Sequence, residues 1–290
     1  MDTQQTSSTP SASRLARAVA RRQRARRSLL ISTGSTVIVI GGLAALILTS
    51  PGWPSVRRTF FSSSAFFESF VKVLGGFWLD VRMFLVVEAA VLVLGLLIAL
   101  CRTTRTPALF PIRLLAVVFT DVMRGVPTIL VVYLIGFGVP ALELSGLPTN
   151  EVTLGGISLA LCYSAYVSEV YRAGIESIHP SQTAAALAIG LTPTQSLRHV
   201  VLPQAVRRVA PPLLNDFIAL QKDVALVSIL GPQEAFRVAQ IVSAEQFNYT
   251  PLLAAAALYL CVTIPLTRVV DRLQSRAQAQ RGAALALAPR

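Results

Sequence analysis

Seven ionisable side chains stand inside or beside long apolar runs, where charge is costly. They are Glu88, Asp121, Arg124, Glu169, Asp216, Lys222 and Asp223. A charged group at the centre of a bilayer costs roughly 2.5–3.5 kcal/mol on insertion scales, so such groups pair with one another or line a polar path. Their chemistry is recognition of polar groups: a lining for a zwitterionic solute or a contact between subunits. Structural pairing or snorkelling at an interface is the alternative.

Spacing suggests partners for some of these groups. Asp121 and Arg124 are three positions apart, and Glu169 and Arg172 share that spacing. Residues three apart lie on the same face of a helix, so each couple can form an ion pair. Glu88 has no such partner nearby in the sequence, and its role is the most open of the group.

No pattern for covalent or metal chemistry occurs in the sequence. His179 and His199 have no cysteine or acidic cluster beside them, and Cys101, Cys162 and Cys261 are far apart in or beside apolar stretches. Such cysteines are typical of small buried hydrophobes. Neither G-x-S-x-G nor the phosphate loop G-x-x-x-x-G-K-[ST] is found. We therefore expect a non-catalytic chain that binds no metal and no cofactor itself.

The elements that must position these residues are predicted to be membrane helices. The 290 residues are 53% hydrophobic and 14% charged, against roughly 25% charged in soluble domains. A span needs ~20 apolar residues. Six runs qualify at least approximately: Leu29–Leu48, Met83–Leu100, Leu114–Val139, Leu154–Val170, Ala210–Leu230 and Leu252–Thr267. The predicted fold class is an all-α integral membrane protein, a polytopic bundle of about six transmembrane helices.

Composition also predicts how the chain is divided. The first apolar run is longer than the core of a signal peptide and lacks a small-residue cleavage site, so we interpret it as a retained span. The expected order is a disordered Arg-rich tail, a transmembrane helix, an external amphipathic linker rich in aromatic residues, a membrane domain and a second tail. The corresponding ranges are 1–27, 28–50, 51–78, 79–272 and 273–290.

Basic residues indicate the orientation. If the N-terminus is inside, 19 of the 26 Lys and Arg residues fall in inside segments and 5 in outside segments. Positive residues concentrate on the cytoplasmic side of membrane proteins, so both termini are expected there. This bias explains the net charge of +12 without nucleic acid, and the N-terminal arginines can contact anionic membrane lipid.

The loop after the fourth run contains the capping signals of two short helices. Ser181 is expected to cap a helix over Gln182–Ile189, which ends at Gly190 in a left-handed conformation. Thr192-Pro193-Thr194-Gln195 is a capping box that begins a second helix. The alanines of the first helix permit close approach of another body. From the residues alone, a docking helix and an ordinary loop helix packed on its own domain are about equally supported.

This loop resembles the EAA loop of binding-protein-dependent ABC import permeases. The family pattern is E-A-A, three residues, Gly, nine residues, then I-x-L-P. Here Ala185-Ala186 precede Gly190, and Val200-Val201-Leu202-Pro203 follow at the right distance. Val200 replaces Ile, and Ala184 replaces Glu at the third position of the predicted helix. A Glu there could close a capping box with Ser181.

The resemblance extends over about residues 78–272 and is strongest to the polar amino-acid uptake subfamily. Arg124-Gly125-Val126-Pro127 is similar to its Arg-Gly-Thr-Pro. The stretch 165–175 matches its Ala-Tyr-x-x-Glu-x-x-Arg-x-Gly-Ile element, and Pro211-Pro212-Leu213-Leu214-Asn215 continues the match. Lys222-Asp223-Val224-Ala225-Leu226 resembles its Lys-Asp-Thr-Ser-Leu, with two polar residues replaced by apolar ones.

The resemblance implies a permease subunit of an ATP-driven importer in the bacterial cytoplasmic membrane, with a five-helix type I core plus the N-terminal span. Its implied partners are an ABC ATPase dimer, which uses ATP and Mg, a second permease copy or paralogue, and an extracytoplasmic solute-binding protein. The implied ATPase-coupling residues lie in the 181–203 loop: Ser181, Gln182, Ala184, Ala185, Ala186, Gly190, Leu202 and Pro203. The candidate solute-pathway residues are Glu88, Asp121, Arg124, Tyr166, Glu169, Asn215, Lys222 and Asp223.

Two other functions compete with this interpretation. A stand-alone secondary transporter of small polar solutes predicts internal repeats and broken spans in both halves, and no repeat is found. An intramembrane enzyme would need paired acids, clustered histidines or a nucleophile at matching depth, and the sequence shows none of these patterns.

Overall fold

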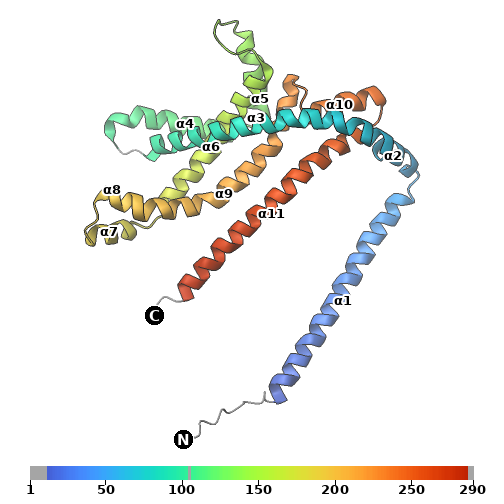
Figure 1. The fold of residues 1–290 in the computed structure, drawn as a ribbon, viewed down its shortest axis with the longest axis horizontal. Helices are drawn as coiled ribbons and strands as arrows, with labels where there is room; N and C mark the ends of the chain where they lie inside the picture. The colour runs from blue at the N-terminus through green and yellow to red at the C-terminus, as the bar shows by residue number, and fades with distance from the viewer. Residues whose placement is uncertain (1–11, 104–105, 287–290) are drawn as a thin grey trace. The chain divides into compact units, whose positions relative to one another are not determined.

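The computed structural model describes residues 12–103 and 106–286, with side chains described for 27–103 and 106–275. Every regular element in that part of the chain is a helix (Figure 1), which confirms the all-α class. The chain divides into two units, Met1–Arg58 and Thr59–Arg290.

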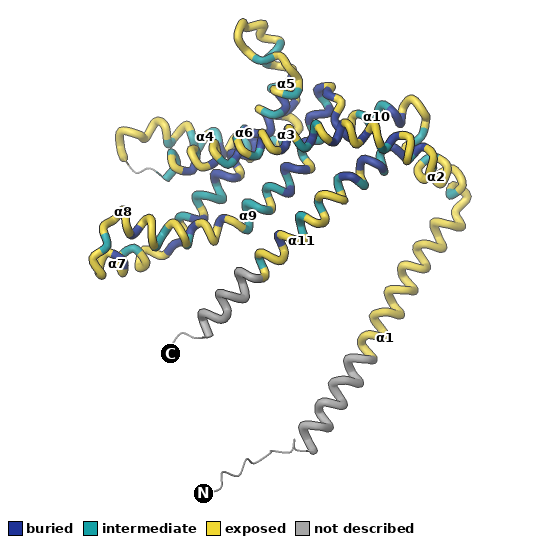
Figure 2. Tube along the Cα trace, in the orientation of Figure 1, coloured by how far each residue is buried: buried dark blue, intermediate teal, exposed yellow. Residues whose placement is uncertain are grey.

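The first unit is dominated by α1 (Ala12–Leu48), which is followed by the short amphipathic helix α2 (Trp53–Phe60). Residues 27–48 of α1 are all exposed (Figure 2), although they are long and apolar enough to cross a membrane. A long helix of apolar side chains is suited to lipid, as expected for the predicted first span.

Helix α3 (Ser63–Thr103) is the longest element of the second unit at 41 residues, about 60 Å. It packs mainly on α6 (Glu151–Glu176). The predicted start of this span at Met83 is too late, because the aromatic stretch before it continues the same helix from Ser63. No proline interrupts residues 63–83, and the helix continues through Gly75-Gly76.

The predicted span Leu114–Val139 is wrong as a single helix. After the short 3₁₀ helix η1 (Pro107–Leu109), the chain forms α4 (Phe110–Gly125) and α5 (Thr128–Ala141), which are bent by 108°. Val126, directly before Pro127, is extended at φ −98° and ψ 133°. A proline disfavours the helical conformation of the preceding residue, so the chain turns there.

The chain then runs through α7 (Pro180–Ala188), α8 (Pro193–Ser196), a π-helical turn η2 (Leu197–Val201) and α9 (Leu202–Asp223). Leu202-Pro203 does not interrupt the helical backbone, because α9 follows the π turn without a non-helical residue. The Leu202 N–H donates to the Leu197 carbonyl, five residues back. Pro203 has no N–H to donate, and it stands in the first turn of α9, where none is needed.

Three elements complete the fold: the 3₁₀ helix η3 (Val224–Leu230), α10 (Ala235–Gln246) and α11 (Thr250–Ala286). The main core lies where α3, α5, α6, α9 and η3 meet, and buried residues gather along these elements in Figure 2. Its fully buried members include Val91, Val132, Leu159 and Leu220. A smaller cluster joins α3, α10 and α11 through Val73, Ala239 and others.

Among the described residues, three stretches are long and apolar enough to cross a membrane: Arg27–Leu48, Trp53–Thr103 and Thr250–Ser275. The bent pair α4 and α5 would make a fourth. Helices α6 and α9 have 26 and 22 residues but carry ionisable side chains such as Glu169 and Lys222. The count of six spans therefore stays a prediction from the sequence.

Candidate functional site

The loop between α6 and α9 forms a compact helical turn at one end of these two helices (Figure 1). Gly190 ends α7 with φ +90°, as the sequence predicted. Its N–H donates to the Leu187 carbonyl at 3.0 Å, and the Leu191 N–H donates to the Ala186 carbonyl at 3.1 Å. This is the Schellman arrangement, which satisfies the last carbonyls of a helix. A residue with a β-carbon would be strained at this position.

The start of α8 also follows the sequence. Thr192 Oγ1 accepts from the Gln195 N–H at 3.3 Å, and Gln195 Oε1 accepts from the Thr192 N–H at 2.9 Å. The predicted capping box is therefore confirmed. With a glycine ending one helix and a capping box beginning the next, the turn between α7 and α8 has a defined shape.

The predicted cap of α7 is wrong. His179, not Ser181, is the N-cap, and its Nδ1 accepts from the Ser181 N–H at 3.2 Å. Pro180 can occupy the first helical position because its ring fixes a helical φ, which moves the cap two residues towards the N-terminus. Ala184 then lies at the fifth helical position, so a Glu there could not form a capping box with Ser181.

Two hydrogen bonds attach this loop to α9. Gln204 Nε2 donates to Gln182 Oε1 at 3.2 Å, and the Arg208 guanidinium donates to the Ser177 carbonyl. Ala186 is buried at 3% exposure, whereas Ala184 and Ala185 are exposed. The helix thus packs one alanine on its own chain and leaves two facing away. Leu202 is exposed as well.

A cluster of charges surrounds Glu169 near the same end of α6. Arg102 Nη1 lies 2.6 Å from Glu169 Oε2, Arg124 Nη1 lies 3.8 Å from it, and Arg172 bonds the other oxygen. Arg172 also pairs with Glu176. The predicted Glu169–Arg172 pair is present, and three arginines from α3, α4 and α6 share one carboxylate.

The predicted pair of Asp121 with Arg124 is absent from the described residues, and Asp121 is exposed on α4. Arg124 turns to Glu169 and also faces Tyr166, with its guanidinium carbon 5.8 Å from the ring centroid. Glu169 is only about one quarter exposed, so it offers the guanidinium a stronger partner than a solvated carboxylate does. Tyr166 therefore joins the Glu169 cluster.

The remaining pathway candidates are dispersed. Tyr163 donates to Asp223 Oδ2 at 2.8 Å, and Glu88 on α3 interacts electrostatically with Asp216 on α9. Asp216 Oδ2 is buried and has no hydrogen-bond partner among the described residues. Lys222 is exposed. The structure thus brings together Arg124, Tyr166 and Glu169 but not all eight candidates.

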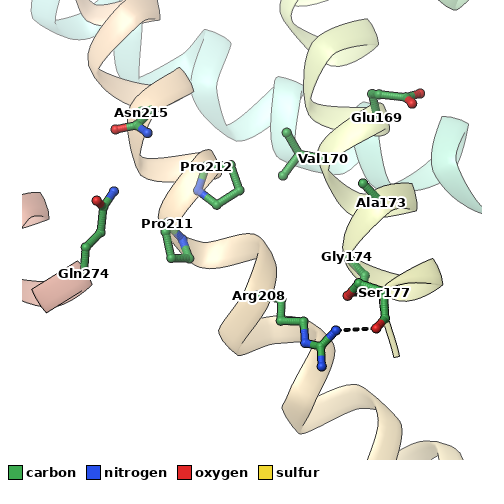
Figure 3. Close-up of a pocket in the computed structure, with 10 residues that line it drawn as sticks. All are labelled: Glu169, Val170, Ala173, Gly174, Ser177, Arg208, Pro211, Pro212, Asn215 and Gln274. Atoms are coloured by element: carbon green, nitrogen blue, oxygen red, sulfur yellow. Dashed lines mark hydrogen bonds between the residues drawn. The ribbon is translucent and has the colours of Figure 1, made fainter. Parts of the chain in front are cut away.

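A pocket of about 680 Å³ lies between α6, α9 and α11 (Figure 3). Arg208 stands near one end, bonded to Ser177, and Glu169 and Asn215 border the pocket farther along. A glycine at position 174 allows the helices to approach, since an added β-carbon would collide with the Val209 side chain. The polar side chains around this pocket are an amide at Asn215, a guanidinium at Arg208 and a carboxylate at Glu169.

Several candidate residues were not identified from the sequence. Arg102 was not among the candidate residues, yet its Nη1 forms an ion pair with Glu169 Oε2 at 2.6 Å. Asp80, Glu234 and Tyr259 come from three distant segments and meet through hydrogen bonds. The sequence around Glu234 offers one local signal: Gly231-Pro232 marks a turn, and an acidic residue after a turn can stabilise the N-terminus of a helix.

The sequence is similar to those of known membrane transport proteins. The family described as "Binding-protein-dependent transport system inner membrane component" matches residues 91–279. A permease protein of Rickettsia felis, GlnP, named for a glutamine transport system, is 34% identical over 186 residues, which cover 64% of this chain and 83% of that protein. The arginine transport system permease protein ArtQ of Bacillus subtilis is 31% identical over 196 residues, which cover 67% of this chain and 87% of that protein.

A solved structure of an amino acid transporter is also similar to this chain. The crystal structure of an amino acid ABC transporter with histidines has a TM-score of 0.65 and 30% sequence identity, covering 75% of this chain and 98% of that chain. The family match spans well over half of the sequence. This multi-pass membrane chain belongs to the family of binding-protein-dependent transport system inner membrane components.

Proposed function

We propose that this chain is the permease subunit of an amino acid ABC importer, and that residues 181–203 couple it to a separate ATPase. The observation that carries the coupling role is the shape of the α7–α8 turn. A Schellman end at Gly190 and a capping box at Thr192 fix the turn, while Ala184 and Ala185 remain exposed. Small exposed side chains on a rigid helix let another protein approach its backbone closely.

The rest of the assembly follows from the family. The chain has no phosphate loop, so the partner ATPase dimer would bind ATP and Mg. A second permease copy or paralogue and an extracytoplasmic solute-binding protein complete the proposed complex. Exposed apolar side chains on α3 and α5, such as Val86, Val93 and Leu134, suit lipid or the second permease. In the proposed orientation both termini and the α7–α8 turn face the cytoplasm.

A polar amino acid is the proposed solute. The relatives are named for glutamine and arginine transport, and both solutes carry a zwitterionic backbone with a polar side chain. The interior of this chain offers matching groups: the Glu169 cluster with its arginines, and Glu88 beside Asp216. Rigid motion of α7 with the ATPase would change the packing of α6 and α9, because Gln182 and Ser177 are bonded to α9.

A site-specific crosslinking experiment tests this proposal. A photo-crosslinking residue at exposed Ala185 should capture a nucleotide-binding subunit when the chain is purified from its native membrane. The same group at exposed Leu147, in the loop between α5 and α6, should not. Capture of the ATPase from position 147 but not from 185 would refute the coupling role. Uptake of labelled glutamine and arginine by the reconstituted complex with ATP tests the solute class.

A further inference from the structure

Three polar side chains from distant segments meet beside the start of α10. They are Asp80 on α3, Glu234 directly before α10, and Tyr259 on α11. The Tyr259 hydroxyl lies 2.8 Å from Asp80 Oδ2 and 3.4 Å from Glu234 Oε2. Asp80 is 3% exposed and Glu234 is 0% exposed. Two acids are thus buried against one hydroxyl.

The donors around these carboxyl groups are too few for two carboxylates. Glu234 accepts from the N–H groups of Phe236 and Arg237 at 2.7 and 2.6 Å, and Asp80 Oδ2 accepts from the Ala235 N–H at 3.3 Å. Asp80 Oδ1 is buried and has no donor among the described residues. A tyrosine hydroxyl has a single hydrogen and can serve only one of the two acids.

One additional proton would complete the network. The two carboxyl groups can hydrogen-bond each other when one of them is protonated. The backbones are also in close contact, because a β-carbon on Gly76 of α3 would lie 2.7 Å from the Glu234 carbonyl carbon. Carboxylates this close do not both ionise without a penalty. Burial, and then the charge of Asp80, raise the pKa of Glu234 to about 8.

No basic group compensates the two acids within the described residues, since neither takes part in an ion pair. On α3, Arg82 stands over the Trp78 ring and Lys72 is exposed. On α10, the Arg237 guanidinium bonds Gln240 at 3.4 Å. η3 has no ionisable side chain, and α11 has none but Tyr259 and Cys261 before Arg268.

We propose that Asp80, Glu234 and Tyr259 form a binding site for one proton, and that this proton holds α10 against α3 and α11. With α10 detached, both carboxyl groups regain ordinary pKa values near 4. The docked state therefore binds more protons between about pH 4.5 and 8, and docking weakens as pH rises through that window. Above about pH 8 the dependence ends. In the orientation proposed above this site faces outside; only that statement rests on the proposed function.

Cysteine labelling of the full chain in lipid nanodiscs tests the site. The three native cysteines are replaced by alanine, and a thiol is placed on α10 either at buried Ser243, which is 4% exposed, or at exposed Ala244. The maleimide rate at position 243 is divided by the rate at position 244, so that the effect of pH on thiol ionisation cancels. The ratio then reports how readily α10 detaches. The ratio should rise by up to about tenfold per pH unit between pH 5.5 and 8 and then level off. A ratio independent of pH would overturn the proposal.

Two variants assign the effect to the proposed residues. Asp80→Asn keeps an acceptor for Tyr259, adds a donor towards Glu234 and removes the charge of Asp80. The rise of the ratio with pH should therefore become shallower and move to lower pH, while burial still acts on Glu234. Glu234→Gln should flatten the profile in the same way. Glu245→Gln, which removes an exposed acid on the same helix, should leave the profile of the parent chain unchanged. A parental profile in both Asp80→Asn and Glu234→Gln would refute the assignment.

Discussion

Gly174 on α6 faces Val209 on α9 so closely that an added β-carbon would collide with the valine side chain. The contact lies beside the pocket that Arg208 and Glu169 border. It therefore fixes the distance between the two helices that lead into the α7–α8 turn. The glycine at this point is needed for close approach, since its own position is within a regular helix.

Gly174→Ala should separate α6 from α9. Overpacking of a tight contact typically costs about 1–3 kcal/mol, so we expect a lower unfolding temperature and reduced transport. Gly138→Ala is the matched control, because that helical glycine has no atom within 4 Å of an added β-carbon, and it should be neutral or slightly stabilising. Thermal unfolding in detergent distinguishes them, and equal effects would contradict the close contact.

Glu169→Gln should destabilise the chain, because it leaves the side chains of Arg102 and Arg172 without their shared carboxylate. Arg102 is 11% exposed, so we expect a loss of about 2 kcal/mol in unfolding free energy, below the 3–5 kcal/mol of a fully buried pair. Asp271→Asn removes an exposed pair with Arg268 at 3.9 Å and should cost almost nothing. Denaturant titrations measure both, and a stable Glu169→Gln protein would refute this ranking.

Gly190→Asp should abolish solute-stimulated ATP hydrolysis by the assembled transporter. The aspartate is strained at φ +90° and alters the turn between α7 and α8. Gly146→Asp is a matched control, since Gly146 has φ +91° in the loop between α5 and α6 and likewise has open space around it. Membrane insertion should be normal for both. Hydrolysis and uptake unaffected by Gly190→Asp would exclude a coupling role for the turn.

Gly76→Ala should loosen α10, because the added methyl group would lie 2.7 and 2.9 Å from backbone atoms of Glu234 and Ala235. We expect faster labelling of a thiol at position 243 at every pH. Gly75→Ala, one residue earlier on the same helix, has nothing within 4 Å of an added β-carbon and should leave the rate unchanged. Identical labelling rates in the two variants would contradict the close contact between α3 and α10 at Gly76.

Local signals in the sequence were accurate where a few adjacent residues decide the structure. The capping box of Thr192 and Gln195 and the left-handed Gly190 depend on neighbours within one turn. The cap of α7 was misplaced because two residues on either side of Pro180, His179 and Ser181, have side chains that can accept from a helix N-terminus. The apolar runs predicted the all-α membrane fold, and the family match at residues 91–279 confirms the family resemblance.

Tertiary partners were not predictable from spacing. Arg124 has a carboxylate three residues away on its own helix, yet pairs with Glu169 on another helix. The same holds for Asp80, which is 179 residues from the tyrosine that donates to it. Contacts of this kind depend on how α3, α6, α10 and α11 pack, and a single sequence carries no direct record of that arrangement.

The π turn at Leu197–Val201 places one residue more between α8 and α9 than a regular α turn would. Since each residue rotates an α-helix by about 100°, every side chain of α9 points about 100° away from the direction that a helical wheel continued from α8 would assign. Removing a single residue from this turn would restore the uninterrupted phase. Exposed positions such as Val206 would then point about 100° away from their present direction, although no residue of α9 itself had been altered.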